Sequence, residues 1–112
     1  QQLKYGNGYD HNFVLGLKKQ WGLNHAATVD GDRSGILLDI YTTEPGMQFY
    51  SGNFMAGKNT FANGSKDDFR TAFCLETQHF PNSPNQPNFP TTVLKPGEVF
   101  KSMSLYKFSV KQ

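Results

Sequence analysis

Apolar residues along the chain either alternate with polar ones or form short runs, and no stretch repeats with the period of an amphipathic helix. Gly, Pro or Asn interrupts these stretches roughly every eight to twelve residues, a spacing that is typical of β-sandwich proteins. We therefore predict an all-β fold. The predicted strands cover residues 11–17, 23–29, 35–41, 47–50, 71–77 and 99–110.

Turn residues separate several of these strands. Residues 30–35 (DGDRSG) predict a hairpin turn, because Asp and Gly accept the left-handed backbone of such loops. Residues 44–46 (EPG) predict a second turn, since Pro fixes its own φ and Gly permits a positive φ beside it. Residues 56–68 have the composition of an exposed loop. Residues 80–96 carry five of the six prolines, and a loop of this length is usually functional or packed against something.

The last predicted strand is rich in apolar residues. This pattern predicts a largely buried strand. The apolar residues are Met103, Leu105, Tyr106, Phe108 and Val110.

Composition agrees with a single β-rich domain and limits its partners. The 112 residues suffice for one core, and aromatic residues make up 14%, with ten Phe. The net charge of +2, from 11 basic and 9 acidic side chains, is too even to indicate a nucleic-acid or membrane surface. The densest basic spot, Lys18 and Lys19, is read as a solvated strand end.

Cys74 is the only cysteine, so no internal disulfide is possible and nothing requires an oxidising compartment. We interpret it as a small buried hydrophobic residue rather than a nucleophile. We expect a cytoplasmic protein, and a periplasmic or secreted location stays open because a removed signal would leave no trace. No apolar run reaches the ~18 residues of a membrane span.

Glu76 is a carboxylate inside an otherwise apolar strand that ends before Pro81. Burying a carboxylate is costly unless it is hydrogen-bonded or paired, and desolvation raises the pKa of a carboxyl group, which suits proton transfer near neutral pH. Strand alternation places Glu76 on the face of Cys74 and Gln78, with Phe73 directed to the core. The alternative is that Glu76 faces solvent on an edge strand.

Asp10 and Gln48 are further candidates, in both cases for binding a sugar. Asp10 follows the glycine-containing residues 6–8, and its alternative role is to cap backbone amides at a turn. Gln48 precedes Phe49, and amides beside aromatic rings are typical of carbohydrate sites, although any β-protein core could contain the same aromatic residues. His11 follows Asp10 but should face the opposite way. No spacing of histidines and carboxylates resembles a metal site, so no metal is predicted.

Several runs, taken together, resemble the aldose 1-epimerase family, whose members are also called galactose mutarotases. The runs are residues 8–13 (GYDHNF), 41–54 (YTTEPGMQFYSGNF) and 73–81 (FCLETQHFP), followed by 84–90 (PNQPNFP) and 94–98 (LKPGE). The resemblance covers nearly the whole chain, in order. It implies a large antiparallel β-sandwich, the supersandwich of the galactose mutarotases, with residues 1–112 as roughly the C-terminal third of one catalytic domain.

The resemblance also implies roles for individual residues. Glu76 matches the general base that takes the proton from the anomeric C1 hydroxyl, and Asp10 and Gln48 match residues that bind the sugar. His11 belongs to the substrate-binding run and is not the general acid. The family's general acid is a His in an Asn-x-x-Asp-His motif that precedes the matched runs, and this motif does not occur in residues 1–112.

The implied reaction is the interconversion of the α and β anomers of free hexoses such as galactose and glucose. Base and acid open the ring, C1 rotates, and the ring closes again, with no cofactor. Because the acid is missing, we expect that an N-terminal portion of the protein is absent, that it is a partner of this segment, and that the segment alone is inactive. The alternatives are a noncatalytic carbohydrate-binding β-sandwich and an all-β interaction domain.

Overall fold

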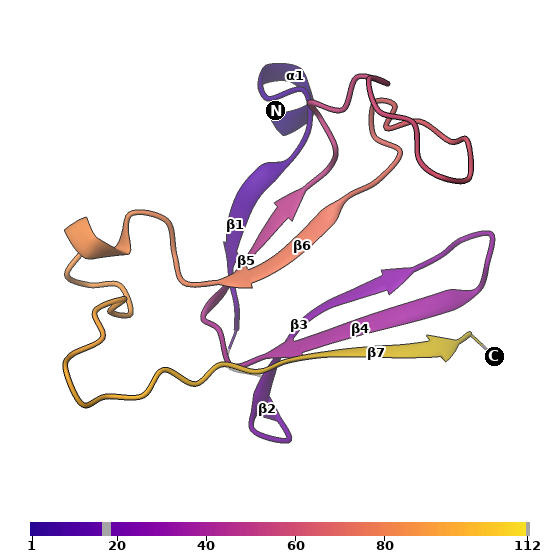
Figure 1. Ribbon diagram of the computed structural model, residues 1–112. Helices are drawn as coiled ribbons and strands as arrows, with labels where there is room; N and C mark the ends of the chain where they lie inside the picture. Colours follow the sequence, from indigo (N-terminus) through magenta and orange to yellow (C-terminus); the bar gives the residue numbers. More distant parts are fainter. Residues whose placement is uncertain (17–18, 112) are drawn as a thin grey trace. The chain divides into compact units, whose positions relative to one another are not determined.

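A computed structural model describes residues 1–16 and 19–111 (Figure 1). The predicted all-β fold class is confirmed, since helix is limited to two short turns. The elements in chain order are α1 (Gln2–Tyr5), β1 (Asp10–Val14), β2 (Lys19–Gln20), β3 (Leu23–Asp30), β4 (Ile36–Thr42), β5 (Gly46–Tyr50), β6 (Cys74–Gln78), the 3-10 turn η1 (Ser83–Asn85) and β7 (Ser104–Val110).

One antiparallel sheet has four strands in the order β2-β3-β4-β7 and contains the three longest strands, β3, β4 and β7. β3 and β4 are joined by the hairpin predicted at residues 30–35. Within this hairpin turn, Gly31 donates its backbone N–H to the carbonyl of Ile36 at 2.9 Å. Gly35 adopts the left-handed backbone that the turn requires, with a φ of +66°. β7 pairs with β4 from Ile36↔Val110 to Thr42↔Ser104, so the end of the chain returns to this hairpin.

β1, β5 and β6 form a second sheet in the order β1-β5-β6. Figure 1 shows β5 running opposite to both of its neighbours. The predicted turn at residues 44–46 leads from β4 into β5. The long connection from β5 to β6 contains the expected exposed loop, with a single bridge between Thr60 and Lys66.

By their contacts the residues divide into two compact units. The first comprises Gln1–Phe13 and Gln48–Glu76, and the second comprises Val14–Met47 and Thr77–Gln112. The second unit contains a small core in which Ile40 is fully buried. Its other buried apolar side chains are Leu23, Tyr41 and Met47.

Two predicted strands begin later than expected. Residues 71–73 are not in β6, because Arg70 has a positive φ of 58° and Thr71 donates its N–H to the carbonyl of Asp68 in a turn. Residues 99–103 are not in β7, since Met103 bonds through both of its backbone groups to Thr43, in the bend after β4. The predicted strand end at Leu17 and the basic residue Lys18 lie outside the described part of the chain.

Two predictions of burial were wrong. β7 is an edge strand with β4 as its neighbour, and its apolar side chains are largely exposed, with 69% for Phe108 and 73% for Val110. Cys74 is also exposed. In both cases the residues lie on an edge strand, β7 or β6, which has a neighbouring strand on one side only.

Candidate functional site

Asp10 and Gln48 lie opposite each other on neighbouring strands. Asp10 is the first residue of β1, and Gln48 is in the middle of β5. The side-chain amide of Gln48 donates from Nε2 to Oδ1 of Asp10 at 2.7 Å. The other amide atom, Oε1 of Gln48, is buried and has no hydrogen-bond partner among the described residues. Because a buried acceptor without a donor is costly, this oxygen is suited to receive a hydroxyl from a ligand.

Aromatic contacts show which face of the three-stranded sheet carries this pair. The ring of Phe49 lies 5.4 Å from the ring of Tyr9 and 6.2 Å from that of Phe73. These three rings therefore share one face. Successive side chains of extended backbone point to opposite faces, so the residues adjacent to these rings lie on the other face.

Glu76 belongs to that polar face together with Asp10 and Gln48. Phe73 lies on the aromatic face, so alternation directs Cys74, the next residue, to the opposite face. Glu76 is two residues further along and therefore shares the face of Cys74. Leu75 and Thr77, on the opposite phase, are half-buried, whereas Cys74 and Glu76 are exposed. Each of the three strands thus supplies one of the predicted site residues to a single face.

The side chain of Glu76 is exposed to solvent, which is one of the two alternatives that the sequence left open. The alternative of a solvent-facing carboxylate describes its surroundings in this chain. The reason is that the polar face of the sheet is open, and the aromatic face is also incompletely covered, with Phe73 50% exposed. The apolar neighbours in the sequence therefore do not desolvate this carboxylate.

The buried side chain of Asn53 fixes the backbone of Tyr9, the residue before Asp10. Asn53, which is 6% exposed, donates from Nδ2 to the carbonyl of Tyr9 at 2.8 Å and accepts the hydroxyl of Ser51 at 2.6 Å. Ser51 in turn accepts the N–H of Tyr9 at 2.9 Å. Gly8 lies against Asn53 so closely that a Cβ there would be 1.8 Å from Oδ1. The absence of a side chain at Gly8 therefore serves this packing, and Asp10 bonds to Gln48 rather than capping a turn.

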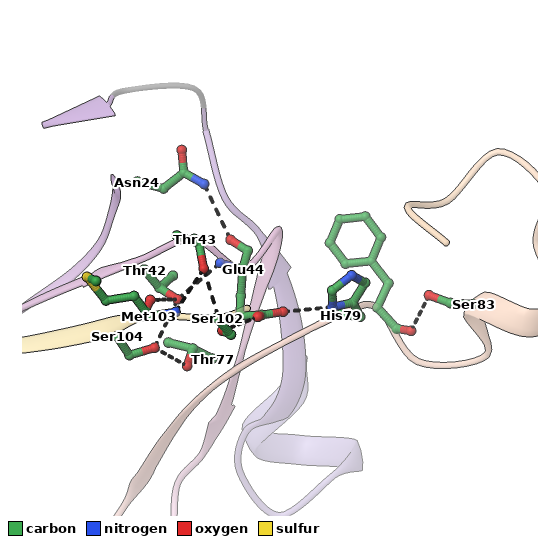
Figure 2. Close-up of polar contacts among 11 residues, drawn as sticks. Asn24, Thr42, Thr43, Glu44, Thr77, His79, Ser83, Ser102, Met103 and Ser104 are labelled. Atoms are coloured by element: carbon green, nitrogen blue, oxygen red, sulfur yellow. Dashed lines mark hydrogen bonds and ion pairs between the residues drawn. The ribbon is translucent and has the colours of Figure 1, made fainter. Parts of the chain in front are cut away.

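A second polar cluster was missed by the sequence analysis. Glu44, in the bend between β4 and β5, is only 7% exposed (Figure 2). Its Oε2 lies 2.7 Å from Nδ1 of His79, and its Oε1 accepts the hydroxyl of Ser102. Since an ionised carboxylate only accepts hydrogen bonds, Nδ1 of His79 carries the hydrogen of this contact. The only signal in the sequence was an ordinary Glu-Pro-Gly turn, which gives no indication of burial.

Hydroxyl groups extend this cluster toward β6 and β7. Thr42 donates from Oγ1 to the carbonyl of Met103 at 3.2 Å, and its oxygen is 3.0 Å from the hydroxyl of Ser104. Ser104 also contacts the hydroxyl of Thr77 at 2.8 Å (Figure 2). The cluster therefore joins the end of β4, the end of β6 and the start of β7.

The remaining histidines are not part of the polar face. The ring of His11 contacts Tyr9 at 5.9 Å, which places it on the aromatic face, away from Asp10 as predicted. His25 lies on β3, where its Nε2 is 3.2 Å from Oδ1 of Asp39. The hydroxyl of Thr28 donates to the same Asp39 oxygen at 2.6 Å and holds the pKa of Asp39 below its ordinary value, with a smaller contribution from His25.

The described residues contain neither a metal-binding cluster nor a membrane-spanning helix. Across residues 1–16 and 19–111, no group of three or more His, Cys, Asp or Glu side chains is arranged to hold a metal ion. In the same residues, no helix has the length and apolar character needed to cross a membrane.

Comparison with known proteins identifies the family that this chain matches. The family model described as aldose 1-epimerase matches residues 1–107. The chain is 45% identical to galactose mutarotase from Homo sapiens over 104 residues, which are 93% of this chain and 30% of the human protein. It is 39% identical to aldose 1-epimerase from Escherichia coli (strain K12) over 103 residues, or 90% of this chain and 29% of that protein.

The described residues form an all-β protein of two sheets, and the phase of its strands directs Asp10, Gln48 and Glu76 to one face of the three-stranded sheet. The chain belongs to the aldose 1-epimerase family. It spans less than a third of the length of the relatives it matches.

Proposed function

We propose that this chain is the C-terminal segment of an aldose 1-epimerase that interconverts the α and β anomers of free hexoses such as galactose and glucose. The proposal is supported by the hydrogen bond between Gln48 and Asp10 and by the strand phase of Glu76, which directs its carboxylate to the same face of the β1-β5-β6 sheet. The family membership of residues 1–107 and the names of the relatives, galactose mutarotase and aldose 1-epimerase, support it.

In this proposal Glu76 is the general base. Its carboxylate takes the proton from the C1 hydroxyl while an acid outside this chain protonates the ring oxygen, and the C1–O5 bond breaks to give the open aldehyde. Rotation about C1–C2 and the reverse proton transfers then close the ring to the other anomer. The open polar face leaves Glu76 accessible to a sugar, and a sugar together with the rest of the protein would supply the desolvation that the isolated strand lacks.

Asp10 and Gln48 bind sugar hydroxyls in this proposal. The carboxylate of Asp10 accepts hydroxyl hydrogens, and the unpartnered Oε1 of Gln48 accepts another. Because Nε2 of Gln48 is already committed to Asp10, the orientation of the amide is fixed before the sugar binds. The residues needed for the acid step precede this segment, so the segment alone is proposed to be inactive.

The single, unpaired Cys74 supports a cytoplasmic location.

The test is polarimetric mutarotation of α-galactose by the full-length protein and its Glu76→Gln variant. Loss of a general base should lower kcat by roughly 10²–10⁴-fold. Asp32→Asn removes an exposed carboxylate from the β3–β4 turn and serves as the control, with an expected rate equal to that of the parent. An unchanged rate in Glu76→Gln would remove Glu76 as the base. Binding of galactose without any mutarotation by the parent would favour the noncatalytic carbohydrate-binding alternative.

A further inference from the structure

Glu44 is the most deeply buried carboxylate that the proposed reaction does not use. A turn between two strands is normally built from exposed residues, and burying a carboxylate costs several kcal/mol unless donors compensate for the lost water. Glu44 has two side-chain donors, His79 and Ser102. Its backbone is also fixed, because its N–H donates to Oγ1 of Thr42 at 3.1 Å and its carbonyl accepts from Nδ2 of Asn24 at 3.3 Å.

The two ends of the Glu44–His79 contact lie next to strands that carry proposed site residues. Glu44 is two residues before the start of β5, which contains Gln48. His79 directly follows β6, three residues after Glu76. β5 and β6 are hydrogen-bonded neighbours in the sheet, so this contact ties the beginning of one to the end of the other (Figure 2).

A second contact holds the same end of β6. The hydroxyl of Thr77, the residue after Glu76, lies 2.8 Å from that of Ser104, which is itself bonded to Thr42. Thr77 faces away from Glu76 by alternation, so this contact fixes the strand without occupying the polar face. At about 3.3 Å per residue, both contacts act within about 10 Å of the Glu76 backbone.

We propose that Glu44 and His79 are positioning residues, which hold the end of β6 against the start of β5 and thereby fix the carboxylate of Glu76 relative to Gln48. This inference rests on the proposed function and names two further residues on which the rate of the proposed mutarotation depends. A displacement of about 1 Å of a catalytic group can cost about 10²-fold in rate, so a loose strand end would lower kcat. The sugar contacts of Asp10 and Gln48 would be largely kept.

The experiment compares His79→Gln with His79→Asn in the full-length protein, by steady-state mutarotation of galactose. The Asn amide nitrogen occupies the place of Nδ1 and can still donate to Glu44, whereas the Gln nitrogen corresponds to Nε2 and cannot. We expect His79→Gln to lower kcat by about 10–100-fold with KM within about 3-fold of the parent. We expect His79→Asn to keep kcat within about 3-fold.

A second pair of variants tests the same contact from the other side. Glu44→Gln keeps an acceptor for His79 and should behave like His79→Asn, whereas Glu44→Ala should behave like His79→Gln. The double variant Glu44→Ala/His79→Gln should lose no more than either single one, since both remove one contact. Equal losses in His79→Asn and His79→Gln, or a parental kcat in His79→Gln, would overturn the inference.

The outcomes separate this inference from the proposed function. If the parent is active and Glu76→Gln is inactive while His79→Gln retains parental kcat, only the positioning role fails. If Glu76→Gln is as active as the parent, or the parent does not mutarotate galactose, the proposed function fails and the positioning role fails with it.

Discussion

Gln48 reaches across from β5 to Asp10 on β1 and donates from Nε2 to Oδ1 at 2.7 Å, which leaves its own Oε1 buried without a partner among the described residues. Among the described residues, the amide of Gln48 therefore uses only its donor side. A sugar hydroxyl that donates to Oε1 would complete it at little reorganisation cost, because the amide is already oriented.

This relationship predicts a binding defect in Gln48 variants of the full-length protein. Gln48→Ala removes one hydrogen bond to the sugar and should raise KM for galactose about 10-fold, because a bond worth about 1.4 kcal/mol corresponds to tenfold in affinity. Gln48→Glu should raise KM further, since its carboxylate repels that of Asp10. The measurement is a set of steady-state mutarotation curves, with Lys101→Ala as an exposed control. A large loss of kcat at unchanged KM would contradict a binding role.

Gly8 provides a prediction for stability. Its φ is +149°, and a Cβ would lie 1.8 Å from Oδ1 of the buried Asn53. Gly8→Ala should therefore lower the free energy of unfolding of the full-length protein by about 1–3 kcal/mol, through backbone strain and displacement of Asn53. The measurement is urea denaturation followed by circular dichroism.

Two other glycines are matched controls for this experiment. Gly64 has a φ of +82° but open space around the position of a Cβ, so Gly64→Ala tests backbone strain alone and should cost about 1 kcal/mol. Gly16 has open space and no positive φ in the range that strains a side chain, so Gly16→Ala should be near neutral. Equal effects at Gly8 and Gly64 would show that the packing against Asn53 does not matter.

The lowered pKa of Asp39 predicts a pH-dependent contribution to the stability of the protein. The Thr28 hydroxyl lowers the folded-state pKa of Asp39 below the ordinary value of 3.8, and His25 and Lys107 lower it by smaller amounts. A lowered folded-state pKa stabilises the protein above the unfolded-state pKa, and this stabilisation is lost as pH falls through the folded-state value. Parent and Thr28→Val should therefore differ in Tm at pH 5, and the difference should shrink as the pH falls below the ordinary Asp pKa of 3.8. A difference that grows on acidification would show the opposite linkage.

Strand positions and turns could be predicted from the sequence because they depend on local pattern. The hairpin at residues 30–35 follows from Asp and Gly in the turn. Strand alternation correctly predicted that Asp10 and His11 point to opposite faces of the sheet, as do Glu76 and Leu75. Burial could not be predicted in the same way. Apolar neighbours indicate which side chains can be covered, but whether Glu76, Cys74 and β7 are covered depends on layers that these residues do not themselves provide.

The Glu44–His79–Ser102 contacts could not be predicted for a different reason. The three residues are separated by long stretches of sequence and come together only when the bend after β4 meets the end of β6 and the segment before β7. Each residue alone is unremarkable in its local context. Only the pairing of distant segments reveals that the turn glutamate is buried.

The exposed apolar side chains of β7 give the last prediction, which concerns residues 1–112 produced alone. β7 is the edge of its sheet, and alternation places Tyr106, Phe108 and Val110 on one face, where they are 49%, 69% and 73% exposed. Unpaired edges and uncovered apolar faces promote association. We expect the isolated chain to bind a hydrophobic dye and to elute from size-exclusion columns at an apparent mass that rises with concentration.

Two variants identify the source of this association. Phe108→Lys removes an exposed apolar side chain from the edge strand and should reduce both dye binding and apparent mass, because a charged edge resists pairing. Lys107→Arg, on the opposite phase of the same strand, keeps the charge and should change neither. A monomeric, cooperatively unfolding chain that does not bind the dye would show that residues 1–112 need no further layer, and the proposal that they form one segment of a larger catalytic domain would lose its physical basis.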